Sequence, residues 1–275
     1  MSYEFFIALR YLRTKRKQAF ISVITVIAVI GVMIGVAVMI LVLSGMSGFE
    51  EDLKSKILGA YAHIVLLQHG GGIENYEAVA RKVREVDGVV GVTPFIYNEV
   101  MLTSGNRVAG VVLRGIDPDT IGEATQLPEN LQEGSLAALR APPAPPGAPR
   151  LAGIIVGVEI ARTLSLEVGD EVTVVSPIGT VTPAGNAPSY KKFRVVGTFA
   201  SGMFEFDAKF AFIELSEAQR FFETGDTVTG LVIKVNDVLA SDTISRAIQQ
   251  KLGFPYWTRD WKEMNRNLFS AIQLE

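Results

Sequence analysis

Residues Ala19 to Met46, AFISVITVIAVIGVMIGVAVMILVLSGM, decide how this chain is organised. No charged residue occurs between Lys17 and Glu50. As a helix rising ~1.5 Å per residue, the stretch would reach ~42 Å, more than the ~30 Å hydrocarbon core of a bilayer. Lipid offers no partner for free backbone N–H and C=O groups, so a lone span is helical despite its many Val and Ile residues. The stretch therefore predicts a transmembrane helix over residues 19–46.

The charges on either side of this span predict its orientation. The first 17 residues carry five basic side chains and one acid, whereas Glu50, Glu51 and Asp52 follow the span. The positive-inside rule then places the N-terminus in the cytoplasm and the rest of the chain outside. A cleaved signal peptide is the alternative, but its apolar region would be shorter and would end in an A-x-A-like site. We interpret the span as an anchor.

Length and composition limit what the exported part can be. The chain has 275 residues, a formal net charge of −3 and no cysteine. About 225 residues remain outside the span, enough for one large domain or two small ones. Without disulfides such a domain depends on its own hydrophobic core. The acidic balance beyond the basic N-terminus disfavours nucleic acid as a partner.

The segments around the span are also patterned. Residues 1–18 combine apolar side chains on one helical face with basic ones elsewhere, which is typical of a helix on the inner membrane surface; a basic stop signal is the alternative. Gly31 and Gly35 form a GxxxG pair that allows close approach of another helix. Beyond the span, Phe49, Leu53 and Ile57 continue an apolar stripe to Gly59. This pattern predicts a stalk helix over residues 47–59.

The remaining chain alternates between strand-like and helix-like segments, which indicates an α+β fold. We expect a mixed α/β subdomain from residues 60–116 and 206–256, interrupted by a β-rich insert over residues 117–205. A second stalk helix is predicted over 257–275, because Trp261, Asn265, Leu268 and Ile272 share one helical face. The proline-rich APPAPPGAP, residues 141–149, is predicted to be an extended surface loop. The predicted strands are 63–68, 91–102, 107–116, 154–158, 171–175, 193–199, 208–214 and 230–236, and the predicted helices are 76–86, 158–164, 217–222 and 238–252.

Residues 176–192 form the most unusual segment between two predicted strands. This loop has few apolar residues and contains Pro183 and Pro188, which stiffen it. A long loop of this kind within a compact domain is uncommon unless it is functional. A stiff loop loses little entropy on binding, so the sequence predicts a protruding, hairpin-like docking arm. An elaborate surface turn is the alternative.

The residues predict no catalytic site. There is no G-x-x-x-x-G-K-[ST] motif for ATP and no G-x-S-x-G elbow for a serine nucleophile. The two histidines, His63 and His69, would need scattered carboxylates to hold zinc. We therefore expect a chain that is not an enzyme and that uses no metal or cofactor.

Five stretches carry a family resemblance that covers nearly the whole chain in order. It resembles the lipoprotein-releasing permeases of the LolC/LolE type, in the broader group of MacB/FtsX-like permeases. The resemblance implies an inner-membrane subunit with a MacB-like periplasmic domain, followed by three more spans that the downstream DNA should encode. The stretches are residues 9–64, LRGIDP from Leu113, VGVEIARTLSLEVGDEV from Val156, TPAGNAPSYKKFRVVGTF from Thr182, and WKEMNRNLFSAIQLE from Trp261.

The resemblance also implies a function and its partners. Such permeases extract lipoproteins from the inner membrane and pass them to a periplasmic chaperone, powered by a separate cytoplasmic ABC ATPase and working with a second permease subunit. Two alternatives are an efflux or mechanotransmitting permease of the same superfamily and a stand-alone, membrane-anchored periplasmic binding domain. An open reading frame for further spans would separate the permeases from the lone domain.

By this resemblance, two groups of residues are assigned roles. Val42, Met46 and Phe49, at the outer end of the span, match positions that contact lipoprotein; ordinary lipid-facing or helix-packing residues are the alternative. Asn186 lies where we expect a basic residue in the docking loop, so Lys191 and Lys192 are the candidates to supply that charge. The chaperone-docking hook implied for this chain comprises Thr182, Pro183, Ala184, Gly185, Asn186, Ala187, Pro188 and Ser189.

Overall fold

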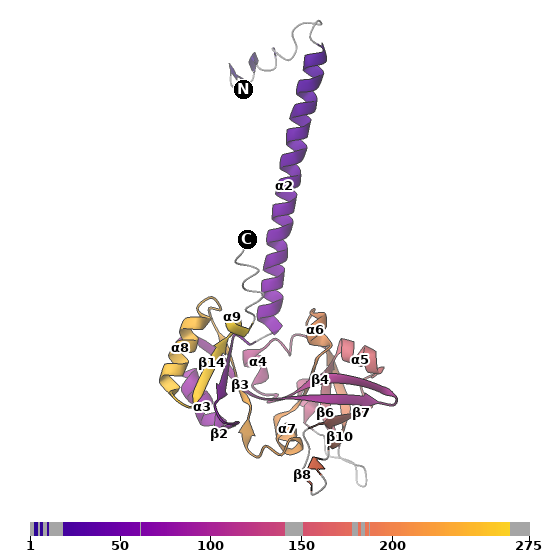
Figure 1. The fold of residues 1–275 in the computed structure, drawn as a ribbon, viewed down its shortest axis with the longest axis vertical. Helices are drawn as coiled ribbons and strands as arrows, with labels where there is room; N and C mark the ends of the chain where they lie inside the picture. Colours follow the sequence, from indigo (N-terminus) through magenta and orange to yellow (C-terminus); the bar gives the residue numbers. More distant parts are fainter. Residues whose placement is uncertain are drawn as a thin grey trace. The chain divides into compact units, whose positions relative to one another are not determined.

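The computed structural model contains one long helix and one compact unit that begins at Ser55 (Figure 1). It describes residues 3, 4, 6, 7, 10, 19–60, 62–140, 151–177, 181, 182, 185, 186 and 188–264. The N-terminal surface helix predicted over residues 1–18 and the proline-rich segment 141–149 lie largely or wholly outside these residues. The structure confirms the predicted class, an N-terminal apolar helix followed by an α+β domain.

The apolar helix is α2, Ala19–Ala60. Its segment Val23–Met46 has a mean hydropathy of 3.2, and none of this segment is buried within the protein. Among the described residues, it is the single helix long and apolar enough to cross a membrane. A helix that exposes apolar side chains on every face suits a lipid environment.

A ten-stranded sheet forms the centre of the compact unit. Its strand order is β14-β1-β13-β3-β4-β11-β6-β10-β5, and β7 pairs with both β3 and β10. Most neighbours are antiparallel, while β11 with β4 and β10 with β6 are parallel. The strands are β1 Ile64–Gln68, β3 Val89–Ser104, β4 Arg107–Ile116, β5 Leu131–Gly134, β6 Ala152–Gly157, β7 Glu171–Ser176, β10 Ser189–Phe199, β11 Phe210–Glu214, β13 Gly230–Val235 and β14 Tyr256–Asp260.

Four helices pack on one face of this sheet, which we call the helix-covered face. Each contributes buried apolar residues to the main core, together with every second residue of the strands. Figure 1 shows α3 and α8 beside the β14 end of the sheet and α5 beside the other end. The four helices are α3 Tyr76–Arg84, α5 Val158–Leu164, α7 Leu215–Phe221 and α8 Ser241–Leu252.

The other face, which we call the opposite face, is covered only in part. At one end an aromatic cluster includes Phe199, Phe206 and Phe212, and a smaller cluster around Phe95 lies elsewhere on this face. The short elements that contribute to these clusters are α4 Ile121–Ala124, η2 Leu136–Leu139 and α6 Phe204–Asp207. Two short two-stranded sheets complete the domain, β2 Ile73–Glu74 with β12 Thr227–Val228 and β8 Val181–Thr182 with β9 Gly185–Asn186.

Most of the predicted elements agree with the structure to within a few residues, but the second stalk is wrong at its start. Residues Tyr256–Asp260 form β14, which pairs antiparallel with β1 from Ile64↔Asp260 to Gln68↔Tyr256. The last described helix, α9 Trp261–Met264, begins only after this strand. Pairing with a strand almost 200 residues earlier provides backbone hydrogen bonds that a local helical pattern does not reveal. Residues 265–275 of the predicted stalk lie outside the described part.

The predicted division into a mixed subdomain and a β-rich insert over residues 117–205 stays a prediction. Strands on both sides of its boundaries belong to the same sheet: β6 pairs with β11, and β7 pairs with β3. Two elements that the sequence did not indicate, β5 and η2, precede the proline-rich segment, and Leu139 in η2 is fully buried.

Candidate functional site

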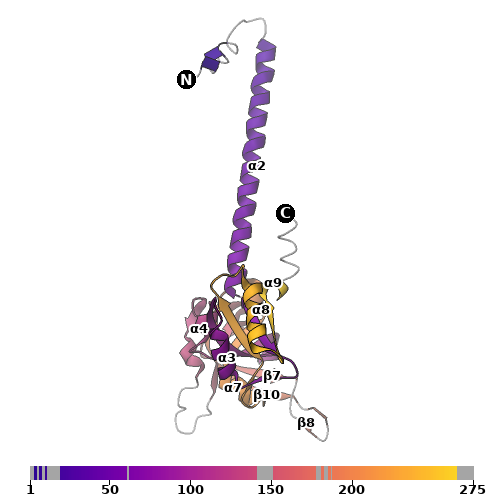
Figure 2. The same ribbon diagram turned by 90° about the vertical axis from the view of Figure 1, so that its left-hand side faces the viewer.

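The loop predicted to dock a partner is a small hairpin carried by two longer strands. β7 and β10 pair antiparallel from Glu171↔Arg194 to Ser176↔Ser189, which closes the base of the loop. Within the loop, β8 pairs with β9 through Val181↔Asn186 and Thr182↔Gly185. Figure 2 shows β8 beyond the ends of β7 and β10. The local sequence folds this way because only two residues, 183 and 184, connect the short strands, a length typical of a tight hairpin.

The predicted hook residues are therefore distributed over both strands of this hairpin. Thr182 lies in β8, and Gly185 and Asn186 form β9. Pro188 is exposed, and Ser189 begins β10. The remaining hook residues, Pro183, Ala184 and Ala187, lie outside the described part of the chain.

The base of this hairpin is anchored by charge pairs. Lys191 Nζ lies 2.6 Å from Glu217 Oε2 in α7, and Glu217 is buried and also accepts a hydrogen bond from Arg220. The Nζ atom of the next residue, Lys192, lies 3.3 Å from Glu171 Oε2 in β7. Both lysines that are candidates to supply the loop's positive charge are thus paired with acids. Lys191 in particular ties the start of β10 to a helix of the main core.

The second predicted group lies on α2. Val42 and Met46 are four residues apart, so they share a helix face, and their exposed fractions are 64% and 45%. The side chain of Phe49 lies outside the described part. Gly31 and Gly35 are also open, because a Cβ placed on either would meet nothing within 4 Å. The helix therefore offers an exposed apolar face and a separate small-residue notch, both accessible to another helix or to lipid.

Sequence reasoning missed a further feature, the environment of Arg114 on β4. Arg114 lies opposite Tyr97 of β3 and Phe212 of β11 in the sheet register. Its Nε atom is buried and has no hydrogen-bond partner, and its guanidinium carbon lies 4.8 Å from the centre of the Phe95 ring. The only sequence signal is a lone arginine within the otherwise apolar strand segment Val111–Ile116.

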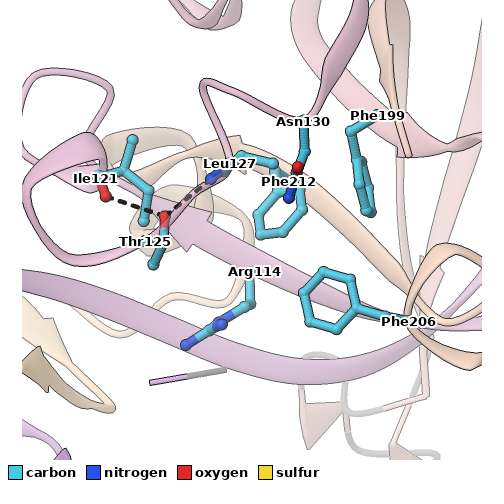
Figure 3. Close-up of a pocket in the computed structure, with 8 residues that line it drawn as sticks. All are labelled: Arg114, Ile121, Thr125, Leu127, Asn130, Phe199, Phe206 and Phe212. Atoms are coloured by element: carbon cyan, nitrogen blue, oxygen red, sulfur yellow. Dashed lines mark hydrogen bonds between the residues drawn. The ribbon is translucent and has the colours of Figure 1, made fainter. Parts of the chain in front are cut away.

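Arg114 borders a cavity of about 20 Å³, shown in Figure 3. The guanidinium is directed away from the ring of Phe206, and Thr125 donates its hydroxyl hydrogen to the Ile121 carbonyl. A space of this size holds at most one water molecule. The cavity is therefore a packing defect beside the arginine rather than a ligand pocket. Its lining residues are Arg114, Ile121, Thr125, Leu127, Asn130, Phe199, Phe206 and Phe212.

Comparison with known proteins places this fold in a family. The sequence matches the MacB-like periplasmic core domain over residues 25–251, and the chain belongs to this family. It thus combines a periplasmic domain with an apolar helix of membrane-spanning length, as an inner-membrane protein does.

Individual relatives are more specific. The chain is 31% identical over 275 residues to the lipoprotein-releasing system transmembrane protein LolC of Neisseria meningitidis serogroup B, covering 100% of this chain and 64% of that protein. It is 32% identical over 269 residues to LolC of Xylella fastidiosa, covering 98% and 63% respectively. The chain therefore spans slightly less than two thirds of the length of these relatives.

Among solved structures, the periplasmic region of MacB from Actinobacillus actinomycetemcomitans is similar, with a TM-score of 0.43 and 14% identity. The match covers 80% of this chain and 96% of that structure.

Proposed function

We propose that this chain is the N-terminal part of a permease subunit in an ATP-driven lipoprotein-releasing complex. The observation that carries the proposal is the likeness to LolC, which extends over the whole chain and includes the loop between β7 and β10. Each acyl methylene taken out of lipid costs about 0.8 kcal/mol, so a lipoprotein does not leave the bilayer at a useful rate unaided. In the proposed complex a separate cytoplasmic ABC ATPase supplies this work, and a second permease subunit completes the membrane path.

In this proposal the hairpin of β8 and β9 docks a periplasmic lipoprotein chaperone. The loop is presented by paired strands and anchored through Lys191 and Glu217, so its base keeps one orientation when a partner binds. Pre-organisation of this kind reduces the entropy lost on association.

The test replaces residues 182–189 with a Gly-Ser segment of equal length in the full chain, held in lipid nanodiscs. Binding of the periplasmic lipoprotein chaperone from the same organism is measured by surface plasmon resonance. We expect the affinity to fall at least about tenfold. The docking residues are replaced, while the ion pairs Lys191–Glu217 and Lys192–Glu171 at the base of the loop remain. A matched control replaces the proline-rich residues 141–149 with Gly-Ser and should bind as the parent does. Equal binding by the hook variant and the parent refutes the docking role.

We further propose that Val42, Met46 and Phe49 contact the lipoprotein's acyl chains. Exposed apolar side chains next to the small residues Gly45 and Gly48 can admit an acyl chain between helices, and methionine adapts its shape to irregular contacts. A photo-crosslinking residue at position 46 in the assembled permease should label lipoprotein. Labelling of phospholipid alone would mean that this face is ordinary lipid-exposed helix.

Finally, we propose that the N-terminus is cytoplasmic and the domain after α2 periplasmic, because the basic side chains precede the span. A reporter enzyme that folds only in the periplasm should be active when fused after Glu275 and inactive when fused before Met1. The reverse pattern would overturn the orientation.

A further inference from the structure

Part of β4 is an open strand edge. β4 pairs with β3 along its whole length, but its other side pairs with β11 only from Val112 onward. Residues 107–111 therefore have no strand beside them on that side among the described residues. α5 contacts β4 from the helix-covered face, where its apolar residues join the main core. Gly110 is exposed, and Val108 leaves 57% of its surface accessible.

The backbone groups of this edge point outward. Val112 donates its N–H to the Lys209 carbonyl at 2.6 Å, so its backbone groups face the side of β11. Because these directions alternate along a strand, Gly110 and Val108 turn their N–H and C=O groups to the same side. Within the described part of the chain, neither residue makes a backbone hydrogen bond there. Unpaired groups at this spacing are a template for another strand.

An apolar groove of about 660 Å³ adjoins the open edge on the opposite face of the sheet. Gly110 lines the groove, and the space beside its Cα is open because a Cβ there would meet nothing within 4 Å. Tyr97, Met101 and Phe210 line it as well, and the first two are exposed. A strand added beside β4 would direct every second side chain toward this face. The groove can therefore receive apolar side chains of an incoming strand.

Lys209 adds a charge at one end of the open edge. Its exposed side chain lines the groove and has no ion pair or hydrogen bond with the described residues. Its carbonyl is held by Val112, which places Lys209 directly beyond the last residue of the edge. Glu99 is the other charged residue of the groove, but it lies on β3, one strand further from the edge. An incoming segment thus meets an unpaired cation, which favours an acidic group at that end.

We propose that the open edge of β4 binds an extended peptide by strand addition, with apolar side chains in the groove and an acidic residue at Lys209. The backbone of an extended peptide repeats its N–H and C=O groups at the same two-residue spacing, so it pairs with those of Val108 and Gly110. Contacts of its alternate side chains with Met101 and Phe210 supply specificity. The inference is independent of lipoprotein release, because it uses neither the hairpin of β8 and β9 nor α2.

The experiment follows the fluorescence anisotropy of a labelled, C-terminally amidated heptapeptide that alternates threonine and valine and ends in glutamate. The full chain is held in phosphatidylcholine nanodiscs, and adsorption to empty nanodiscs is subtracted. We expect saturable binding to the parent chain. Gly110→Pro should weaken binding at least about fivefold, because proline lacks the N–H and its ring occupies the edge. Proline is compatible with a strand where its nitrogen faces an open edge, so the domain should stay folded.

Gly110→Ala is the matched control. It keeps the N–H, and its Cβ meets no neighbour within 4 Å, so it should bind the peptide as the parent does. Absence of saturable binding to the parent, or equal binding by Gly110→Pro and the parent, overturns the proposal. An equal loss in Gly110→Ala and Gly110→Pro also overturns it, because the backbone N–H would then not be the group that binds.

A charge exchange at Lys209 tests the end of the edge without altering the backbone. Lys209→Glu should weaken binding of the peptide that ends in glutamate about threefold, and it should strengthen binding of a peptide that ends in lysine by a similar factor. If circular dichroism shows that Gly110→Pro is unfolded, this exchange decides the question. Unchanged binding of both peptides by Lys209→Glu overturns the proposal.

Discussion

The helix-covered face and the opposite face of the central sheet are built by the same strands, yet their side chains meet different surroundings. On β4, Leu113 is fully buried in the main core, and Gly115 faces α7 so closely that a Cβ there would lie 2.4 Å from the Cβ of Ala218. On the other face of that strand, Gly110 has open space and Arg114 lacks an anion. A period of two residues allows one strand to supply both faces. The comparison indicates that Leu113 and Gly115 of β4 are more tightly packed, on the helix-covered face, than Gly110 and Arg114 are on the opposite face.

The largest expected effect is on the helix-covered face. Leu113→Ala should lower the free energy of unfolding by about 2–5 kcal/mol, because it removes buried methyl groups and leaves a cavity. Met101→Ala on the opposite face, where the side chain is 44% exposed, should change it by about 0.5 kcal/mol. Urea titration of both full-length variants in detergent micelles provides the comparison. If both variants lost the same free energy of unfolding, the two faces of the sheet would contribute equally to stability.

A glycine pair on the same strand sharpens the contrast. Gly115→Ala should destabilise the domain by about 1–3 kcal/mol, since the added methyl group overlaps Ala218 of α7. Gly110→Ala meets no neighbour and should stabilise the domain by about 0.5 kcal/mol, through a smaller conformational entropy of the unfolded chain. Thermal unfolding midpoints should therefore shift in opposite directions. A shift of the same sign for both would contradict the assigned packing.

The smallest effect is expected at Arg114 itself. Arg114→Met loses the attraction to Phe95, worth about 0.5–2 kcal/mol, but it also removes an unpaired donor that costs about 1–3 kcal/mol. The free energy of unfolding should rise by about 1 kcal/mol or stay unchanged. A decrease above about 2 kcal/mol in the same urea titration would mean that the guanidinium has a structural role.

Local patterns in the sequence predicted most of the helices and strands, but little about which strands pair with each other. Alternation and turn residues identified most strands of the central sheet, and Ala19 to Met46 identified the helix that can cross a bilayer. They failed at Tyr256–Asp260, because the helical spacing of Trp261, Asn265, Leu268 and Ile272 was extended back to residue 257, into what is strand β14. Only pairing with β1, far earlier in the chain, selects the strand.

The candidate sites show the same limit. Proline and the shortage of apolar residues marked the loop between β7 and β10, but not the contact of Lys191 with Glu217, 26 residues further on. The sequence likewise shows that Arg114 is charged, but not that it is unpaired. Whether a polar group has a partner depends on several strands at once, and no local pattern contains that information.

The pairing of β1 with β14 has a consequence for how this domain can be moved between proteins. The chain enters the sheet at Ile64 and leaves it at Asp260, which are register partners, and the Trp261 N–H donates to the His63 carbonyl at 2.9 Å. Entry and exit are thus as close as the two ends of a tight turn. Because closing a short gap costs little entropy, a host chain could accept the whole domain in place of a surface turn. The close spacing of its two ends suits this domain to insertion, as a single unit, into a surface loop of another protein.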